Sequence, residues 1–280
     1  MLKKVSKLAE MEIPLFGLGT KGLIGQPCRR VLNTGLNEGV KLIDTNPIFK
    51  NQFMLVEVFK SFKRDQVFLV NKVPAVSLGR LASVEAVEKE LRLINTEYFD
   101  LVLIESPGIQ GLAGKNRHHK RARLETWEAL MKLKEKGKIK HIGVANYTQR
   151  HIDEIWDKFN VLPQANMHEF HPFCYDEERF RYHMEKKIQV IASCPLARVN
   201  KDLYADAVLI ELKKKYKASR VQVLLQWGMQ KGVTVIPKTE NVKHLKENLR
   251  MKFEISLEDM IRIDGLAKNK RLDWVTDSIK

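Results

Sequence analysis

The sequence has few cysteines and no long apolar run, and each scarcity excludes a class of protein. Only Cys28, Cys174 and Cys194 occur in 280 residues, and no two of them form a C-x-x-C pair. This set excludes a disulfide framework and a structural zinc site, and it suits a reducing compartment. No run approaches the ~18 apolar residues that span a bilayer, and the first residues lack the apolar stretch of a secretory signal. We therefore expect a globular cytoplasmic protein with no membrane partner.

Acidic residues are too few to balance the basic ones. The chain has 49 lysines and arginines against 34 aspartates and glutamates, a formal net charge of +15. Such an excess favours anionic partners such as phosphates, nucleic acid or a phosphorylated cofactor. The densest basic run, residues 115–123, has no interleaved aromatic residues on which bases could stack. A solvated basic loop is therefore the favoured interpretation, and nucleic-acid binding rests on charge alone.

Apolar residues make up 44% of the chain, and many of them fall into eight short runs. Between the runs lie amphipathic stretches in which apolar residues recur every three or four positions, as in residues 124–133. Runs such as residues 101–104 are continuously apolar, which is typical of parallel strands buried on both faces. The expected strands are residues 14–20, 41–45, 67–73, 99–105, 141–146, 164–169, 189–195 and 233–238.

Eight strand–helix units in a chain of this length predict an α/β protein with the (β/α)8 barrel fold, the TIM barrel. Residues 3–13 precede the first unit and should cap the barrel floor. The stretch after Met251 should form a terminal helix and a tail. No linker rich in glycine, proline or serine divides the chain, so we expect a single domain over residues 1–280.

A glycine motif after the first expected strand offers a competing interpretation. Gly17, Gly19 and Gly22 match the G-x-G-x-x-G pattern of dinucleotide-binding folds, and Asp44 follows at a suitable distance. That fold requires the third glycine to open a helix whose N-terminus faces the pyrophosphate. Here Pro27 is a better first helical residue, and the remaining strands describe a barrel. We therefore expect a turn at the glycines.

In a barrel of this kind the chemistry lies at the C-terminal ends of the strands. The polar residues expected there are Asp44, Lys72, Glu105, Asn146, Glu169, Ser193 or Cys194, and Lys238. Isolated buried ions cost several kcal/mol each, so Asp44, Lys72 and Glu105 should share one hydrogen-bonded site. That site is either a reaction centre or an ion-pair plug that closes the barrel mouth.

Eight segments of the chain carry motifs that recur in the same order in one family of enzymes. They are residues 14–20, 41–45, 71–72, 99–107, 137–146, 166–172, 236–239 and 247–248. Together they resemble the aldo-keto reductase family over nearly the whole chain. The resemblance implies a barrel that binds NADPH and reduces aldehydes and ketones, so that the substrate is a small carbonyl compound. It also implies a tetrad of Asp, Tyr, Lys and His, in which the tyrosine gives a proton to the carbonyl oxygen.

By this resemblance the aspartate and lysine of the tetrad match Asp44 and Lys72, but the other two positions differ. The tyrosine position is Phe49, which has no hydroxyl, and proton donation is worth ~10²–10⁴-fold in rate. The histidine position is Glu105, as in the steroid 5β-reductases of the family, which nevertheless keep the tyrosine. A carboxyl in an apolar pocket can stay protonated and donate a hydrogen bond, although the neighbouring Lys72 should favour the ionised form. We expect carbonyl reduction to be weak or lost.

The implied nicotinamide pocket is also substituted. Its family pattern is a Ser-Asn pair, a Gln and a stacking Tyr, and the matching positions are Ala145, Asn146, Met167 and Ser193. Only the asparagine remains, and each lost hydrogen bond costs ~1 kcal/mol or more. We therefore expect weakened NADPH binding.

The implied adenosine end keeps more of the family pattern. Lys238 and Thr239 match the pair that binds the 2′-phosphate, and Glu247 and Asn248 match the pair that binds adenine. His244 stands where the family usually has arginine, and it is a weaker, pH-dependent partner for an anion. The choice between NADPH and NADH therefore stays open, and an ordinary solvated basic helix is the competing interpretation.

Two classes of function remain. The first is an NADPH-dependent oxidoreductase with a substitute acid, either protonated Glu105 or a water held by Asp44 and Lys72. The second is a non-catalytic barrel that binds NADP as a regulatory or scaffold protein. A metal site at residues 168–171 is disfavoured because neighbouring residues of a strand point to opposite faces. Trp274 in the tail could form a wall over the substrate.

Overall fold

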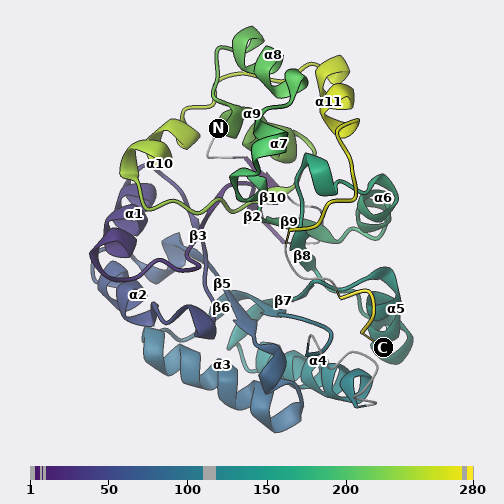
Figure 1. Ribbon diagram of the computed structural model, residues 1–280. Helices are drawn as coiled ribbons and strands as arrows, with labels where there is room; N and C mark the ends of the chain where they lie inside the picture. The colour runs from purple at the N-terminus through teal and green to yellow at the C-terminus, as the bar shows by residue number, and fades with distance from the viewer. Residues whose placement is uncertain (1–3, 7, 9–10, 110–117, 273–275, 280) are drawn as a thin grey trace.

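Eight parallel strands form one sheet at the centre of the protein, and helices surround it (Figure 1). The computed structural model describes residues 4–6, 8, 11–109, 118–272 and 276–279. The order of the strands in space follows their order in the chain. They are β3 (Gly17–Gly19), β4 (Leu42–Asp44), β5 (Phe68–Val73), β6 (Phe99–Ile104), β7 (Ile139–Ala145), β8 (Ala165–Glu169), β9 (Gln189–Ser193) and β10 (Thr234–Val235).

Backbone hydrogen bonds between the first and last strands close the sheet into a barrel. Phe16 forms a parallel bridge with Val235, whose N–H donates to the carbonyl of Leu15 at 2.9 Å. The N–H of Gly19 donates to the carbonyl of Pro237 at 3.1 Å. All eight expected strands lie in this sheet, so the prediction of a (β/α)8 barrel is confirmed.

Helices connect the strands and cover the outside of the barrel (Figure 1). The α-helices are α1 (Gly25–Asn37), α2 (Gln52–Phe59), α3 (Arg80–Ile94), α4 (His119–Glu135), α5 (Gln149–Phe159), α6 (Glu177–Glu185), α7 (Lys201–Tyr204), α8 (Ala207–Lys215), α9 (Arg220–Gln230), α10 (Val242–Leu249) and α11 (Leu257–Asp264). The 3-10 turns are η1 (Pro47–Phe49), η2 (Arg64–Gln66), η3 (Ala75–Ser77), η4 (Pro172–Cys174) and η5 (Ala197–Val199). The helix expected after Met251 is α11.

Local sequence signals set where helices begin. At α9, the Ser219 hydroxyl accepts from the backbone N–H of Gln222 at 3.3 Å, and the Gln222 side chain accepts from the N–H of Ser219 at 2.8 Å. This reciprocal pair satisfies two N–H groups that the first turn of a helix leaves unpaired.

The core has one apolar layer inside the barrel and another between the sheet and the helices. Met11 and Ile13 belong to the inner layer, together with Leu42 and Ala165, the first residues of β4 and β8. Ile13 lies in β2 (Ile13–Pro14), which pairs with β1 (Val5–Ser6) in a small antiparallel sheet. The N-terminal segment therefore caps the barrel floor, as expected.

The glycine motif forms a turn. Gly22 has a φ of +74°, a conformation that favours glycine, and α1 begins at Gly25. The helix therefore starts two residues before Pro27, which lies in its first turn. Since the third glycine does not open the helix, the dinucleotide-fold interpretation is excluded.

Of the solvated basic loop expected over residues 115–123, the described part is a helix instead of a loop, although Lys120 and Arg121 are solvated as expected. Residues 119–123 form the first turns of α4, and Arg123 is buried against Glu154, with 2.5 Å between Nη2 and Oε2. Residues 115–117 lie outside the described residues. Because Arg123 is paired and buried, its positive charge is not available to a nucleic acid.

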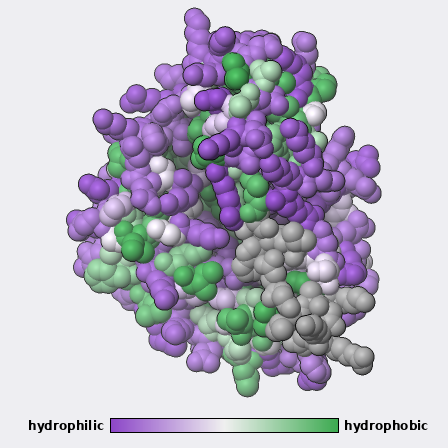
Figure 2. Space-filling view, in the orientation of Figure 1, coloured by the Kyte–Doolittle hydropathy of each residue, from purple (hydrophilic) through white to green (hydrophobic). Residues whose placement is uncertain are grey.

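Hydrophilic side chains cover most of the face seen in Figure 2. Some large apolar side chains are nevertheless exposed, including Phe53 on α2 and Leu81 on α3. No helix in the described part of the chain is both long and apolar enough to cross a membrane.

Candidate active site

Asp44 and Lys72 form a buried ion pair at the C-terminal ends of β4 and β5. Lys72 Nζ donates to Asp44 Oδ1 and, at 3.2 Å, to the carbonyl of Thr45. The two side chains are each only 6% exposed. Burial raises the pKa of the Asp44 carboxyl, and the charge of Lys72 opposes that rise. Each charge compensates the other, because an isolated charge buried at either strand end would be costly.

Glu105 lies beside this pair, directly after β6, and two asparagines fix its position. Asn46 Nδ2 donates to Glu105 Oε1 at 2.5 Å, and Asn146 Nδ2 donates to the Glu105 carbonyl at 3.0 Å. Burial raises the pKa of Glu105, although Lys72 and the bond from Asn46 oppose the rise. We expected Lys72 to favour the ionised form, but burial outweighs its influence.

Phe49 lies next to Lys72, at the end of the 3-10 turn η1. The Asn46 side chain starts this turn by accepting from the N–H of Ile48 at 3.1 Å. The centre of the Phe49 ring is 5.4 Å from Lys72 Nζ. Among the described residues, the acceptors of Lys72 Nζ are a carboxylate and a backbone carbonyl, and neither is a hydroxyl. The ring therefore presents an apolar surface, with no proton to donate, beside the ammonium group.

These residues line a cavity of about 470 Å³ at the barrel mouth. The tetrad positions and the nicotinamide positions of the sequence analysis lie together there. They are Asp44, Phe49, Lys72, Glu105, Ala145, Asn146, Met167 and Ser193. Lys238 and Cys194 also line the cavity. Such a volume lies within the ordinary range for small-molecule sites.

The adenosine-end positions lie beyond this cavity, on and before α10. Lys238 connects the two regions, and its Nζ pairs with Glu240 Oε1 at 2.7 Å. Thr239 Oγ1 accepts from the N–H of Asn241 at 3.1 Å. His244, Glu247 and Asn248 all lie on α10, where His244 is exposed and Asn248 is buried.

Lining residues that the sequence analysis did not single out follow the ends of three strands. Lys21 follows β3, Asn46 follows β4, and Leu196, Arg198 and Val199 follow β9. The rule that chemistry gathers at strand ends could have found the first two. The backbone of residues 197–199 is left-handed, with φ between 49° and 55°, which no sequence signal indicated because none of them is glycine.

Glu169 holds the C-terminal tail. Its carboxylate accepts from the N–H of Leu272 at 2.8 and 2.9 Å and lies 2.6 Å from His171 Nε2. The His168 ring bonds to the Glu169 backbone instead of its carboxylate, with 3.0 Å between Nδ1 and the carbonyl oxygen. The described residues contain no group of three or more His, Cys, Asp and Glu that could hold a metal ion. Trp274 lies outside the described residues.

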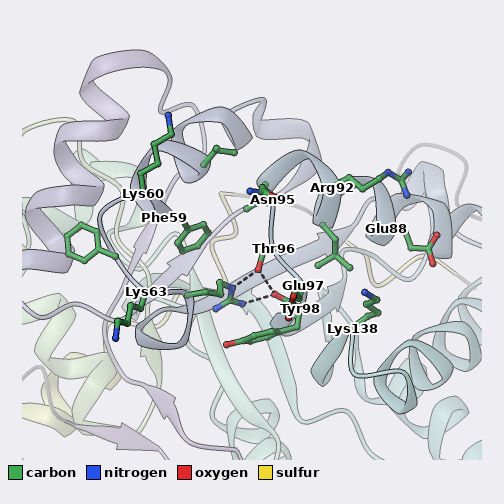
Figure 3. Close-up of a pocket in the computed structure, with 15 residues that line it drawn as sticks. Phe59, Lys60, Lys63, Glu88, Arg92, Asn95, Thr96, Glu97, Tyr98 and Lys138 are labelled. Carbon is green, nitrogen blue, oxygen red and sulfur yellow. Dashed lines mark hydrogen bonds between the residues drawn. The ribbon is translucent and has the colours of Figure 1, made fainter.

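A second hollow, of about 880 Å³, lies at the opposite end of the barrel. It is lined by residues that precede β5, β6 and β7, among them Lys63, Tyr98 and Lys138. Figure 3 shows Lys60 and Lys63 pointing away from each other, while the Arg64 side chain bonds to Thr96 and the Tyr98 carbonyl. These two lysines therefore do not converge on one point in the hollow.

Comparisons with known proteins agree with the barrel fold. The sequence model described as the aldo/keto reductase family matches residues 17–268. Glyoxal reductase of Bacillus subtilis is 34% identical over 276 residues, covering 97% of this chain and 95% of that protein. The 9,11-endoperoxide prostaglandin H2 reductase of Trypanosoma cruzi is 28% identical, covering 96% of this chain and 93% of that protein.

Solved structures give the same result. An aldo/keto reductase of Brucella melitensis superposes with a TM-score of 0.84 at 28% identity, covering 94% of this chain and 99% of that one. A mutant of Gox0644 in complex with NADPH superposes with a TM-score of 0.86 at 26% identity, covering 96% of this chain and 95% of that one. The family match spans most of the barrel, and the relatives match over nearly their full lengths. The chain therefore belongs to the aldo/keto reductase family.

Proposed function

We propose that this protein binds NADP(H) as a single-domain aldo/keto reductase barrel in which carbonyl reduction is weak or lost. One observation carries the proposal: the Phe49 ring lies against Lys72, whose Nζ has no hydroxyl among its acceptors in the described part of the chain. A reduced nicotinamide would supply a hydride to the carbonyl carbon, and the carbonyl oxygen must gain a proton from the protein or from water. A phenyl ring can supply no proton.

The cofactor fits the residues present in part. The cavity reaches from Lys72 to Lys238, so it can take the nicotinamide end while the α10 region takes the adenosine end. Asn146 already donates its amide N–H to the Glu105 carbonyl, and the buried Met167 belongs to the apolar layer inside the barrel. Met167 has no N–H or O–H to offer a carboxamide, and Asn146 has only the second N–H of its Nδ2 amide left for one. Binding should therefore depend on the adenosine end, where Lys238 and Thr239 would hold the 2′-phosphate.

Glu105 is the acid that could replace the missing tyrosine. Burial raises its pKa, so a larger share of this carboxyl is protonated at mildly acidic pH than for an exposed glutamate. Residual reduction should accordingly increase as the pH falls through the pKa of Glu105. A Glu105→Gln variant should lose that increase, because an amide cannot deliver the proton.

The test combines binding and turnover. NADPH affinity is measured by its fluorescence, and NADPH consumption is then followed with glyoxal and a panel of aldehydes. We expect binding with turnover well below ~1 s⁻¹, a common enzyme rate. Phe49→Tyr should raise the rate by ~10²-fold or more where the rest of the pocket can use the hydroxyl. Turnover of the unaltered protein above ~1 s⁻¹ would contradict the proposal.

The second candidate is a scaffold or regulatory barrel that binds NADP without turning over. The substitutions at Ala145, Met167 and Ser193 favour it, because they remove contacts to the ring that donates the hydride. It predicts NADPH binding that Phe49→Tyr does not convert into activity at any pH. The protein would then respond to the bound nucleotide rather than consume it.

A further inference from the structure

Lys21 stands at the mouth of the candidate active site on a turn that hydrogen bonds hold in place. On either side of it, the carbonyls of Thr20 and Leu23 accept from Asn51 Nδ2 at 3.0 and 3.2 Å. The Thr20 hydroxyl donates to the Asp44 carbonyl at 2.8 Å. The backbone of this turn is thus tied to β4 and to the residue before α2. Lys21 reaches the cavity from a fixed base.

The cavity carries more positive than negative charge. Its cationic lining residues are Lys21, Lys72, Arg198 and Lys238, and its carboxyls are Asp44 and Glu105. Lys72 is paired with Asp44, and Lys238 with Glu240. Within the described part of the chain Lys21 has no ion-pair partner, yet its charge acts on both Asp44 and Glu105. Lys21 is thus a cation at a small-molecule site with which no carboxylate of the described residues forms an ion pair.

The rest of the lining is largely apolar. Phe49, Met167 and Ile236 form part of the wall, and Ile48 and Val199 line it while remaining 52% and 61% exposed. Apolar walls with few polar groups are typical of sites that enclose the carbon skeleton of a ligand. A molecule that matched this cavity would have an apolar body and one anionic end.

We propose that Lys21 binds a carboxylate of the substrate, so that the site prefers oxo acids to neutral carbonyl compounds of similar size. This inference rests on the proposed function, because the carbonyl of the same molecule would lie beside Phe49 and Glu105. Because the Lys21 side chain is exposed, solvent screens its bond to a carboxylate, and the bond contributes selectivity for the charged end more than affinity.

The test compares two ketones, the anionic 4-oxopentanoate and the neutral 2-pentanone, by calorimetric titration without cofactor and with NADPH. Lys21→Met removes the charge while keeping an unbranched side chain of similar length. We expect it to weaken 4-oxopentanoate binding by about 2- to 5-fold and to leave 2-pentanone binding unchanged. Lys63→Met, at the opposite end of the barrel, is the matched control and should change neither affinity.

Two results would overturn the inference. Equal affinity of the unaltered protein for both ketones would show that the charge is not recognised. A loss of NADPH affinity in Lys21→Met, with 4-oxopentanoate binding intact, would assign the lysine to the dinucleotide instead. Failure of the proposed function is a separate outcome, since it would appear as absent NADPH binding in the unaltered protein while the titration without cofactor still reports on Lys21.

Discussion

Acidification should destabilise this protein through His183, a residue of α6 that is buried against β8. Its Nδ1 lies 2.6 Å from the Arg179 carbonyl, to which it can donate, and its Nε2 lies 2.9 Å from Asn166 Nδ2, from which it can accept. Both ring nitrogens are therefore used by the neutral form. A second proton would displace the bond from Asn166. Burial, with the charge of Arg179, lowers the pKa of His183 to about 4.

The size and sign of the effect follow from this value. In the unfolded chain the pKa returns to about 6.5, so the two states differ by about 2.5 pH units. At ~1.4 kcal/mol per unit, His183 removes about 3 kcal/mol of stability when the pH falls from above 6.5 to below 4. Within that window the unfolded chain binds the proton and the folded protein does not. The total free energy of unfolding of a domain is only about 5–15 kcal/mol, so the loss should be easy to detect.

The assay is urea unfolding at several values between about pH 7.5 and pH 4.5, followed by the fluorescence of the buried tryptophans Trp127 and Trp227. The free energy of unfolding should fall less steeply with acid in His183→Gln than in the unaltered protein, because glutamine cannot be protonated in this range. His244→Gln, on the exposed side of α10, is the control and should retain the full slope. Parallel curves for all three proteins would refute the reasoning.

Two further predictions concern the barrel mouth and the barrel seam. Lys72→Met should lower the free energy of unfolding by about 3 kcal/mol in urea, because it leaves Asp44 buried without its partner. The double variant Lys72→Met with Asp44→Asn should recover most of that loss, and no recovery would contradict the pairing argument. Gly19→Ala should cost about 1–3 kcal/mol, since the new Cβ would lie 2.9 Å from the Ile236 carbonyl oxygen. Gly265→Ala, whose new Cβ would meet ordinary contacts beyond 3.4 Å, should change the melting temperature little, and equal losses would count against the steric explanation.

The sequence predicted the barrel well because its strands carry a strong local signal. The apolar run that became β6 (Phe99–Ile104) is buried at every position, as a parallel strand covered on both faces must be. The start of α1 was less predictable. Proline favours the first turn of a helix but does not fix its first residue, and here the helix begins at Gly25.

The sequence predicted which charged residues meet at the site, but not how the pKa of Glu105 is shifted there. Reading the strand ends was enough to select Asp44, Lys72 and Glu105, which the structure brings to one cavity. The rise in the pKa of Glu105 depends on how much of its carboxyl is shielded from water, and a sequence does not specify that. Arg123 shows the same limitation, since its partner Glu154 lies on the next helix and no local pattern indicates the pair.

The retention of Asp44 and Lys72 is weaker evidence for catalysis than it first looks. Lys72 also donates to the Thr45 carbonyl, so the pair helps to hold the backbone of the barrel mouth. Removing one partner of a buried pair destabilises a fold whether or not the pair takes part in a reaction. The pair therefore has a structural reason to persist beside a phenyl ring. Evidence for residual chemistry must come from the pH dependence of turnover, because it is the protonation of Glu105, and not its presence at the strand ends, that a reaction would need.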